Sequence, residues 1–348
     1  DPKHNSTSIN NNFKTKNFLK NNECSVNMKI RRYNDSNYDI WEAFVKSSNN
    51  GTLFHSRQFL NYHPENRFQD YSLMLYKKDQ LQSVFPAVSV LEKNKRMLIS
   101  HPGASVGSLV LPENLSISRA IEIAKALVDF SKDRSFNGIR ITIPPILYQK
   151  RMSNYMDYAL IRHGFRYTKR EITSILFLEN DLNKNIKKFR PSHLRAVKKA
   201  KDSGVVVRQT QDFATFYKIL HKNLSIRHNV APTHTLNELL DLKNRIPDKI
   251  NLFGAYLDNE MLAGVINFII NKNVILAFYI SHLEDYQKLR PVNLLFYSIF
   301  DWAINEGVKV YDFGTFTVNE IPNLGLGRFK ENFGASGIYR DTIELNLS

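Results

Sequence analysis

Residues 250–282, INLFGAYLDNEMLAGVINFIINKNVILAFYISH, decide the fold class of this chain. Three extended apolar runs lie within it, and the polar turn Leu257–Glu260 separates the first two in the manner of a β-hairpin. A run of apolar residues with helical spacing and a further extended run follow. The predicted elements, in order, are the strands Ile250–Tyr256, Met261–Ile270 and Val274–Tyr279, the helix Val292–Asn305 and the strand Val308–Phe313.

The same order of elements occurs in the first half of the chain. Tyr76-Lys77-Lys78-Asp79-Gln80-Leu81 aligns with Tyr256-Leu257-Asp258-Asn259-Glu260-Met261 at an offset of 180 residues. A recurrence of this kind predicts a duplicated α/β fold. The expected first-half elements are the strands Tyr71–Tyr76, Leu81–Leu91 and Arg96–Ser100, the helix Ser116–Lys132 capped by Ser116, and the strand Gly138–Ile143.

Length and composition agree with two domains. The chain has 348 residues, of which 43% are hydrophobic, more than one ordinary core requires. We expect an N-terminal domain over 28–170 and a C-terminal domain over 171–348 that holds the active site. Residues 1–27, rich in Asn, Lys and Ser, are expected to be a disordered leader or sequence ahead of a start at Met28.

Charge and cysteine content restrict the environment and the partners. No apolar run reaches the length of a membrane-spanning helix, and the only cysteine, Cys24, lies in the leader. We therefore expect a soluble cytoplasmic protein without disulfides or a cysteine nucleophile. The formal net charge of +15 predicts attraction to anionic partners, such as activated substrates, tRNA or the anionic inner membrane face, although a general lysine bias would give the same charge.

A strongly basic segment, Asp181–Ser203, joins the two halves. It is expected to form a helix interrupted at Pro191 and ended by Gly204. Its cations suit a phosphate backbone, whereas the simpler interpretation is a solvated helix face. The cations are Lys187, Lys188, Arg190, Arg195, Lys198, Lys199 and Lys201.

Two motifs in the second half resemble a known family. Ala196–Val207 resembles the opening of the second half of the Fem family of peptidoglycan-bridge aminoacyltransferases, within the GNAT superfamily. Tyr311-Asp312-Phe313-Gly314, followed by Gly325–Ala335, looks like that family's end motif. Leu53-Phe54-His55-Ser56 and Phe85-Pro86-Ala87 are similar to the opening of GNAT-like acyltransferases found in envelope-polysaccharide gene sets.

The resemblance implies tandem GNAT folds, each a mixed, mostly antiparallel sheet flanked by helices. It also implies transfer of an acyl or aminoacyl group to an amine of a cell-envelope precursor, an amino sugar or a peptide-bearing intermediate. One segment departs from the GNAT pattern, because the expected glycine-rich phosphate loop is replaced by Asp285–Asn293, which has no glycine and contains Pro291. Of the two donor classes, acyl-CoA and aminoacyl-tRNA, this departure argues against acetyl-CoA held by a backbone cradle, and it favours an aminoacyl-tRNA or a donor held by the side chains of Lys288 and Arg290.

Three residues are the candidate catalytic groups. Lys330 is expected to bind a phosphate or to stabilise the negative charge of the transition state, unless it is a plain surface lysine. Asp312, at the end of an apolar strand, would accept the proton of the amine or merely cap the next turn. Tyr279 lies where GNAT folds open two strands for the donor, and it is either a binding residue or a core aromatic.

The candidate substrate-binding residues are Arg227 and His228 in an expected loop, His101 at a strand end, Phe329 beside Lys330, and the loop residues Lys288 and Arg290. Helix termination for the first pair and a structural role for His101 are the competing interpretations. The histidines show no metal-ligand spacing, so we expect no metal. Two other functions stay open: a coenzyme A-dependent N-acetyltransferase of a small molecule, and a non-catalytic RNA-binding protein.

Overall fold

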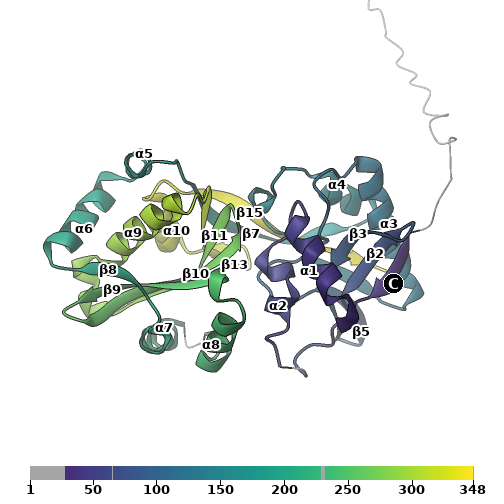
Figure 1. Ribbon diagram of the computed structural model, residues 1–348, viewed down its shortest axis with the longest axis horizontal. Coiled ribbons are helices and arrows are strands. Elements are labelled where there is room, and N and C mark those ends of the chain that lie inside the picture. Colours follow the sequence, from purple (N-terminus) through teal and green to yellow (C-terminus); the bar gives the residue numbers. More distant parts are fainter. Residues whose placement is uncertain (1–27, 65, 229–231, 348) are drawn as a thin grey trace, which may run out of the picture.

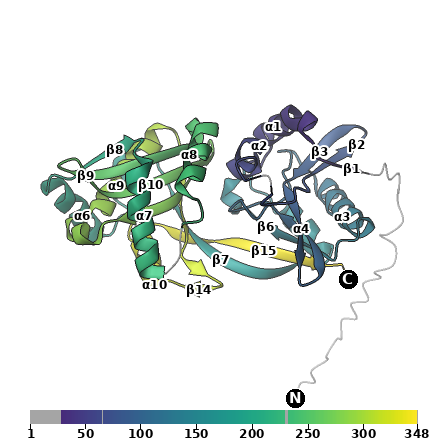
Figure 2. The same ribbon diagram turned by 90° about the horizontal axis from the view of Figure 1, so that it is seen from below.

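The computed structural model describes residues 28–64, 66–228 and 232–347, without the side chains of residues 226–228. Figure 1 shows two halves side by side, each a sheet with helices against it, and Figure 2 shows strands β7 and β15 running between them. Each half follows the order of elements expected from the sequence.

The first half carries its strands and helices over residues 29–177. The elements are β1 (Lys29–Arg32), α1 (Tyr38–Ser47), α2 (Arg57–Leu60), β2 (Leu73–Lys77), β3 (Gln80–Phe85), β4 (Ala87–Glu92), β5 (Lys95–Ser100), α3 (Ile117–Asp133), β6 (Gly138–Thr142), α4 (Tyr155–Arg162) and β7 (Arg166–Phe177).

The second half begins with the basic segment, which forms two helices separated by residues 187–190, the second beginning at Pro191. The elements are α5 (Leu182–Ile186), α6 (Pro191–Asp202), β8 (Val206–Thr210), α7 (Phe213–His228), α8 (Leu236–Arg245), β9 (Ile250–Leu257), β10 (Glu260–Asn271), β11 (Val274–His282), α9 (Pro291–Asn305), β12 (Val310–Thr315), β13 (Thr317–Val318), β14 (Ile321–Pro322), α10 (Leu324–Glu331) and β15 (Ser336–Asn346).

Ten strands form one sheet in the order β4-β5-β6-β15-β7-β12-β11-β10-β9-β8. Only the pairs β5–β6 and β11–β12 are parallel, and they occupy the same place in each half. The expected mixed, mostly antiparallel sheets are therefore present. Strands β1, β2 and β3 form a separate sheet, and β13 pairs with β14.

The hairpin turns show the duplication at the level of backbone angles. Lys78 and Asp79 have φ values of 50° and 59°, and Asp258 and Asn259 have φ values of 47° and 70°. Two successive positive φ values favour a tight two-residue hairpin. The two segments that align in sequence thus form the same turn.

The expected strand Leu81–Leu91 is wrong as a single strand, because it is two strands that meet at Pro86. The first, β3, pairs with β2 in the small sheet, and the second, β4, pairs with β5 in the large sheet. Proline has no N–H for a strand ladder, so Pro86 is a natural point for the chain to leave one sheet and enter the other.

The halves exchange their last strands. Strand β7 leaves the first half and pairs with β12 of the second, and β15 returns from the second half to pair with β6 of the first. Strands β7 and β15 also pair with each other from Arg166 to Ile175. Strand β7 thus runs through position 170, where the sequence pattern places the domain boundary.

The second half opens between its two parallel strands. Strands β11 and β12 pair only over Val274–Leu276 and Val310–Asp312, after which β11 stays with β10 and β12 stays with β7. In the first half the chain after β5 fills the corresponding place, because the Gly107 N–H donates to the Thr142 carbonyl at 2.8 Å. A gap of this kind therefore exists only in the second half.

Candidate functional site

Asp312 is buried on β12, where three donors hold its carboxylate. Oδ2 accepts from the Tyr148 hydroxyl at 2.7 Å, and Oδ1 accepts from the Thr173 hydroxyl at 2.5 Å and from the Gly314 N–H at 2.7 Å. Burying a carboxylate without such donors is costly, so these contacts explain how β12 tolerates a charge in its apolar course. Tyr148 comes from the first half and is itself buried, which raises the pKa of its hydroxyl.

Lys330 lies on the other side of the same short segment. Its side chain is only 2% exposed, and its ammonium donates to the carbonyls of Gly314 at 2.7 Å and Thr315 at 3.0 Å. Burial lowers the pKa of Lys330 to about 8, against the opposing influence of the Asp312 carboxylate. An ammonium has three N–H donors, and these two carbonyls use two of them.

Tyr279 points to the boundary between the halves. Its hydroxyl oxygen accepts the backbone N–H of His234 at 3.2 Å and lies 2.8 Å from His234 Nδ1. The other ring nitrogen, Nε2, lies 2.8 Å from the Tyr62 hydroxyl, so the His234 ring links a hydroxyl of each half. Burial raises the pKa of Tyr279 to about 12 and lowers that of His234 to about 4.

His101 joins the same chain of rings. It stacks on His63 with ring centroids 5.2 Å apart, and His63 lies 4.0 Å from the Tyr62 ring. Burial lowers the pKa of His101 to about 3, so the imidazole is neutral at physiological pH. The structure thus brings His101 and Tyr279, from different halves, into one aromatic chain.

A cleft of about 900 Å³ lies beside the opening between β11 and β12. Its walls come from α6, the end of β11, the start of α9 and α10. Three cations, Arg195, Lys199 and Arg290, line it, and no carboxylate does. The N-terminus of the 15-residue helix α9 also faces it, which adds positive potential.

The predicted binding residues fall in different places. Arg290, with a φ of 61°, and Phe329 line the cleft, whereas the neighbouring Lys288 is exposed and does not. Arg227 and His228 lie in the last turn of α7, and their side chains are outside the described residues.

The basic segment divides its cations between two roles. Arg195 and Lys199 face the cleft, whereas Lys188 donates to the Phe177 carbonyl at 2.7 Å and pairs with Glu179 at 3.0 Å. Lys201 lies over the ring of Tyr297 at 4.1 Å. The expected helix with a break at Pro191 is confirmed, and part of its charge faces a site.

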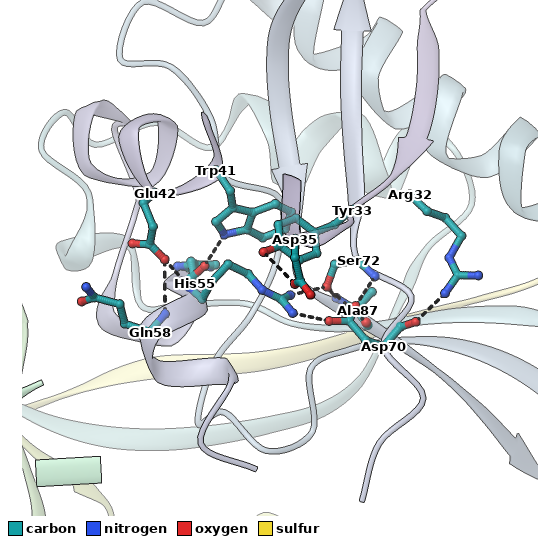
Figure 3. A network of polar contacts seen from close by, with 11 residues as sticks. Arg32, Tyr33, Asp35, Trp41, Glu42, His55, Gln58, Asp70, Ser72 and Ala87 are labelled. Atoms are coloured by element: carbon teal, nitrogen blue, oxygen red, sulfur yellow. Dashed lines mark hydrogen bonds and ion pairs between the residues drawn. The ribbon is translucent and has the colours of Figure 1, made fainter. Parts of the chain in front are cut away.

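The motif Leu53-Phe54-His55-Ser56 of the first half is structural. Figure 3 shows Trp41 donating to the His55 carbonyl, at 2.8 Å, within a network of polar contacts around α1 and α2. The buried Arg57 guanidinium donates to Ser72 at 3.1 Å and pairs with Asp70. The His55 ring is within 2.8 Å of the Gly107 carbonyl, so the motif fixes the segment that fills the first-half opening.

Four residues of these constellations were not singled out from the sequence. Tyr148, Thr173, Tyr62 and His234 come from segments without a recognisable pattern, and three of them precede the second half. The only available signal was a polar residue next to prolines or at a strand end. Among residues 28–64, 66–228 and 232–347, no group of three histidine, cysteine or acidic residues is placed to hold a metal.

Comparisons with known proteins agree with this architecture. Residues 187–331 match the family model described as acetyltransferase (GNAT) domain. The crystal structure of FemX is similar with a TM-score of 0.69 at 14% identity, covering 92% of this chain and 97% of that one. L-PGS from Bacillus licheniformis is similar with a TM-score of 0.56 at 12% identity, covering 88% of this chain and 90% of that one.

A tandem GNAT protein from the clavulanic acid biosynthesis pathway has a TM-score of 0.53 at 9% identity, with 92% of this chain and 99% of that chain covered. No curated protein matches the sequence. The tandem GNAT-like fold is thereby confirmed, and the GNAT domain together with this fold supports an N-acyltransferase. No helix in the described part of the chain is long and apolar enough to cross a bilayer.

Proposed function

We propose that the protein transfers an acyl or aminoacyl group from a phosphate-bearing donor to an amine of a cell-envelope precursor, because residues 187–331 match the acetyltransferase (GNAT) domain model. An amino sugar or a peptide-bearing intermediate is the acceptor class. The observation that carries the proposal is the cleft, which combines Arg195, Lys199 and Arg290 with the α9 N-terminus and contains no carboxylate. Such a surface favours phosphate groups.

We place the donor carbonyl next to Lys330. Lys330 does not line the cleft itself, but it follows the lining residue Phe329 in α10, and one of its N–H groups is not used by the Gly314 and Thr315 carbonyls. In the reaction the neutral amine nitrogen attacks the donor carbonyl carbon and forms the new C–N bond. The carbonyl oxygen becomes negative, and the remaining Lys330 N–H stabilises it.

The collapse of this intermediate breaks the bond from the carbonyl carbon to the sulfur or oxygen of the donor. The amine proton leaves, and the departing thiolate or alkoxide gains a proton. Asp312 is a positioning residue in this scheme, because three donors already occupy its carboxylate. It holds the Gly314–Thr315 segment whose carbonyls bind Lys330.

Two donors fit a cationic cleft, an acyl-CoA and an aminoacyl-tRNA. The cleft draws its cations from side chains and has Pro291 at the first position of α9, where a backbone N–H is missing. An aminoacyl-tRNA suits the cations Arg195 and Lys199 on α6 that line the cleft. Both donors are intracellular molecules, so we place the reaction in the cytoplasm, with acceptors approached in solution or at the anionic membrane face.

Direct binding measurements test the donor site. Acetyl-CoA and an aminoacyl-tRNA are titrated against the full chain, against the double variant Arg195→Gln/Arg290→Gln and against Lys309→Gln, an exposed lysine away from the cleft. We expect the double variant to weaken binding of the true donor about tenfold or more, with a smaller salt dependence, and Lys309→Gln to bind normally.

Equal binding by the double variant and the wild type would remove the cleft as donor site. Binding of acetyl-CoA alone would identify a coenzyme A-dependent N-acetyltransferase. Strongly salt-dependent binding of tRNA without any transfer, in the wild type as in Lys330→Ala, would identify a non-catalytic RNA-binding protein.

A further inference from the structure

The duplication gives the cationic cleft a counterpart in the first half. The segments between β11 and α9 and between β12 and α10 line the cleft. The corresponding segments of the first half, between β5 and α3 and between β6 and α4, line a second, smaller pocket. We call it the first-half pocket. Its walls include Asn49, Ser108, Glu113, Arg151, Tyr155 and Asp157.

The two sites differ in size and charge. The first-half pocket has a volume of about 190 Å³, against about 900 Å³ for the cleft. It is therefore too small for drug-sized ligands, which need roughly 300 Å³ or more. Two carboxylates and one guanidinium line it, so it does not favour an anion.

Ser108 marks the pocket as a built site. It has a φ of 87°, in the left-handed region that a non-glycine residue seldom adopts, and it is 5% exposed. Its hydroxyl has no hydrogen-bond partner among the described residues, although it lines the pocket. This hydroxyl is not among the fully buried side-chain atoms that lack a partner, so it is open to the pocket, and strained residues tend to gather at functional sites.

Asp157 supplies a second group without a full set of partners. One carboxylate oxygen accepts from the Asn154 amide at 2.8 Å, and no ion pair with a described cation is formed. Burial, and more weakly the charge of Asp341, raise the pKa of Asp157. A cation that entered the pocket would relieve this unfavourable environment.

We infer that the first-half pocket binds a small hydroxylated molecule with an ammonium group, of which a free amino sugar is the example. The ammonium pairs with Asp157, a ligand hydroxyl pairs with Ser108, and the ring packs near Tyr155. The site is independent of the proposed acyl transfer, because its residues belong to other segments than the cleft.

Calorimetric titration of the full chain at pH 7.5 tests the inference, with glucosamine as the probe and glucose as the uncharged reference. We expect saturable 1:1 binding of glucosamine, about tenfold or more tighter than that of glucose, because glucose has no ammonium to pair with the half-buried Asp157 carboxylate. Asp157→Asn should remove this preference. Asp129→Asn, which alters an exposed carboxylate on α3, should keep it.

Ser108→Gly provides a second variant that suits the local backbone, because glycine adopts a positive φ without strain. We expect it to be at least as stable as the wild type and to bind glucosamine several-fold more weakly. Absence of saturable glucosamine binding, or wild-type binding by both Asp157→Asn and Ser108→Gly, would overturn the inference. Neither experiment needs a donor, so the proposed acyl transfer is tested separately.

Discussion

Replacing Lys330 by methionine separates a catalytic lysine from a structural one. Methionine keeps the length and apolar stem of the side chain and removes the charge. Burial lowers the pKa of Lys330 from 10.5 to about 8, which corresponds to about 3 kcal/mol of unfavourable environment for the ammonium. Lys330→Met has no ammonium, so it does not carry this cost of burying a charge.

The same substitution removes two hydrogen bonds from an ammonium to the carbonyls of Gly314 and Thr315. Hydrogen bonds to charged groups contribute about 1.5–3 kcal/mol each, so the loss of about 3–6 kcal/mol equals or exceeds the gain. We expect the unfolding free energy of Lys330→Met at pH 7 to fall by about 0–3 kcal/mol. We expect turnover to fall by at least about tenfold, because an oxyanion donor is lost.

The pH dependence of kcat/KM shows whether Lys330 acts as an ammonium or as a neutral amine. If the ammonium stabilises the oxyanion, the ratio of kcat/KM of the wild type to that of Lys330→Met holds below the pKa of about 8 and declines as pH rises through it, because deprotonation of the acceptor amine affects both proteins alike. Denaturant unfolding and initial-rate transfer assays with acetyl-CoA and aminoacyl-tRNA in parallel measure both quantities. A loss of several kcal/mol with normal turnover refutes the catalytic role, and a ratio that rises through pH 8 shows that the neutral amine of Lys330 acts as a base.

Two further predictions concern groups that both halves share. Tyr148→Phe removes one of three donors to the Asp312 carboxylate, and we expect it to lower the unfolding free energy by about 2 kcal/mol in denaturant melts. An unchanged denaturation midpoint would mean that water replaces the hydroxyl. Acid should destabilise the protein through its buried neutral imidazoles, because the pKa values of His101 and His234, about 3 and about 4, lie below the ordinary 6.5. The unfolded chain then binds more protons, so stability is lost as pH falls from about 6.5 towards 4; melting temperatures that stay level across this range would contradict it.

Local patterns predicted the elements of the fold well. The turn residues 77–80 and 257–260 form two hairpins with similar backbone angles, and Ser116 caps α3 as expected. What these patterns lacked was the partner of each strand. Pro86 was visible in the sequence, yet only the pairing of β3 and β4 with different sheets gives it meaning.

The sequence pointed to residues of the candidate site only where they lie in one recognisable segment. Lys330 and Asp312 lie near one another in sequence, and the structure brings them to the two sides of Gly314. Tyr148 and His234 depend on contacts across 164 and 172 positions, to Asp312 and Tyr62 respectively. No periodicity within a short window contains such information.

The strand exchange makes the second half depend on the first for its own chemistry. The segment that matches the GNAT domain, 187–331, contains Asp312 and Lys330 but neither Thr173 nor Tyr148, which hold the carboxylate. It also excludes β7, the strand that covers the edge of β12. Cut free at residue 187, β12 would expose an unpaired edge, and Asp312 would be a buried carboxylate with one donor left. Because an uncompensated buried charge costs several kcal/mol, the first half helps to hold together the site that we propose to be catalytic.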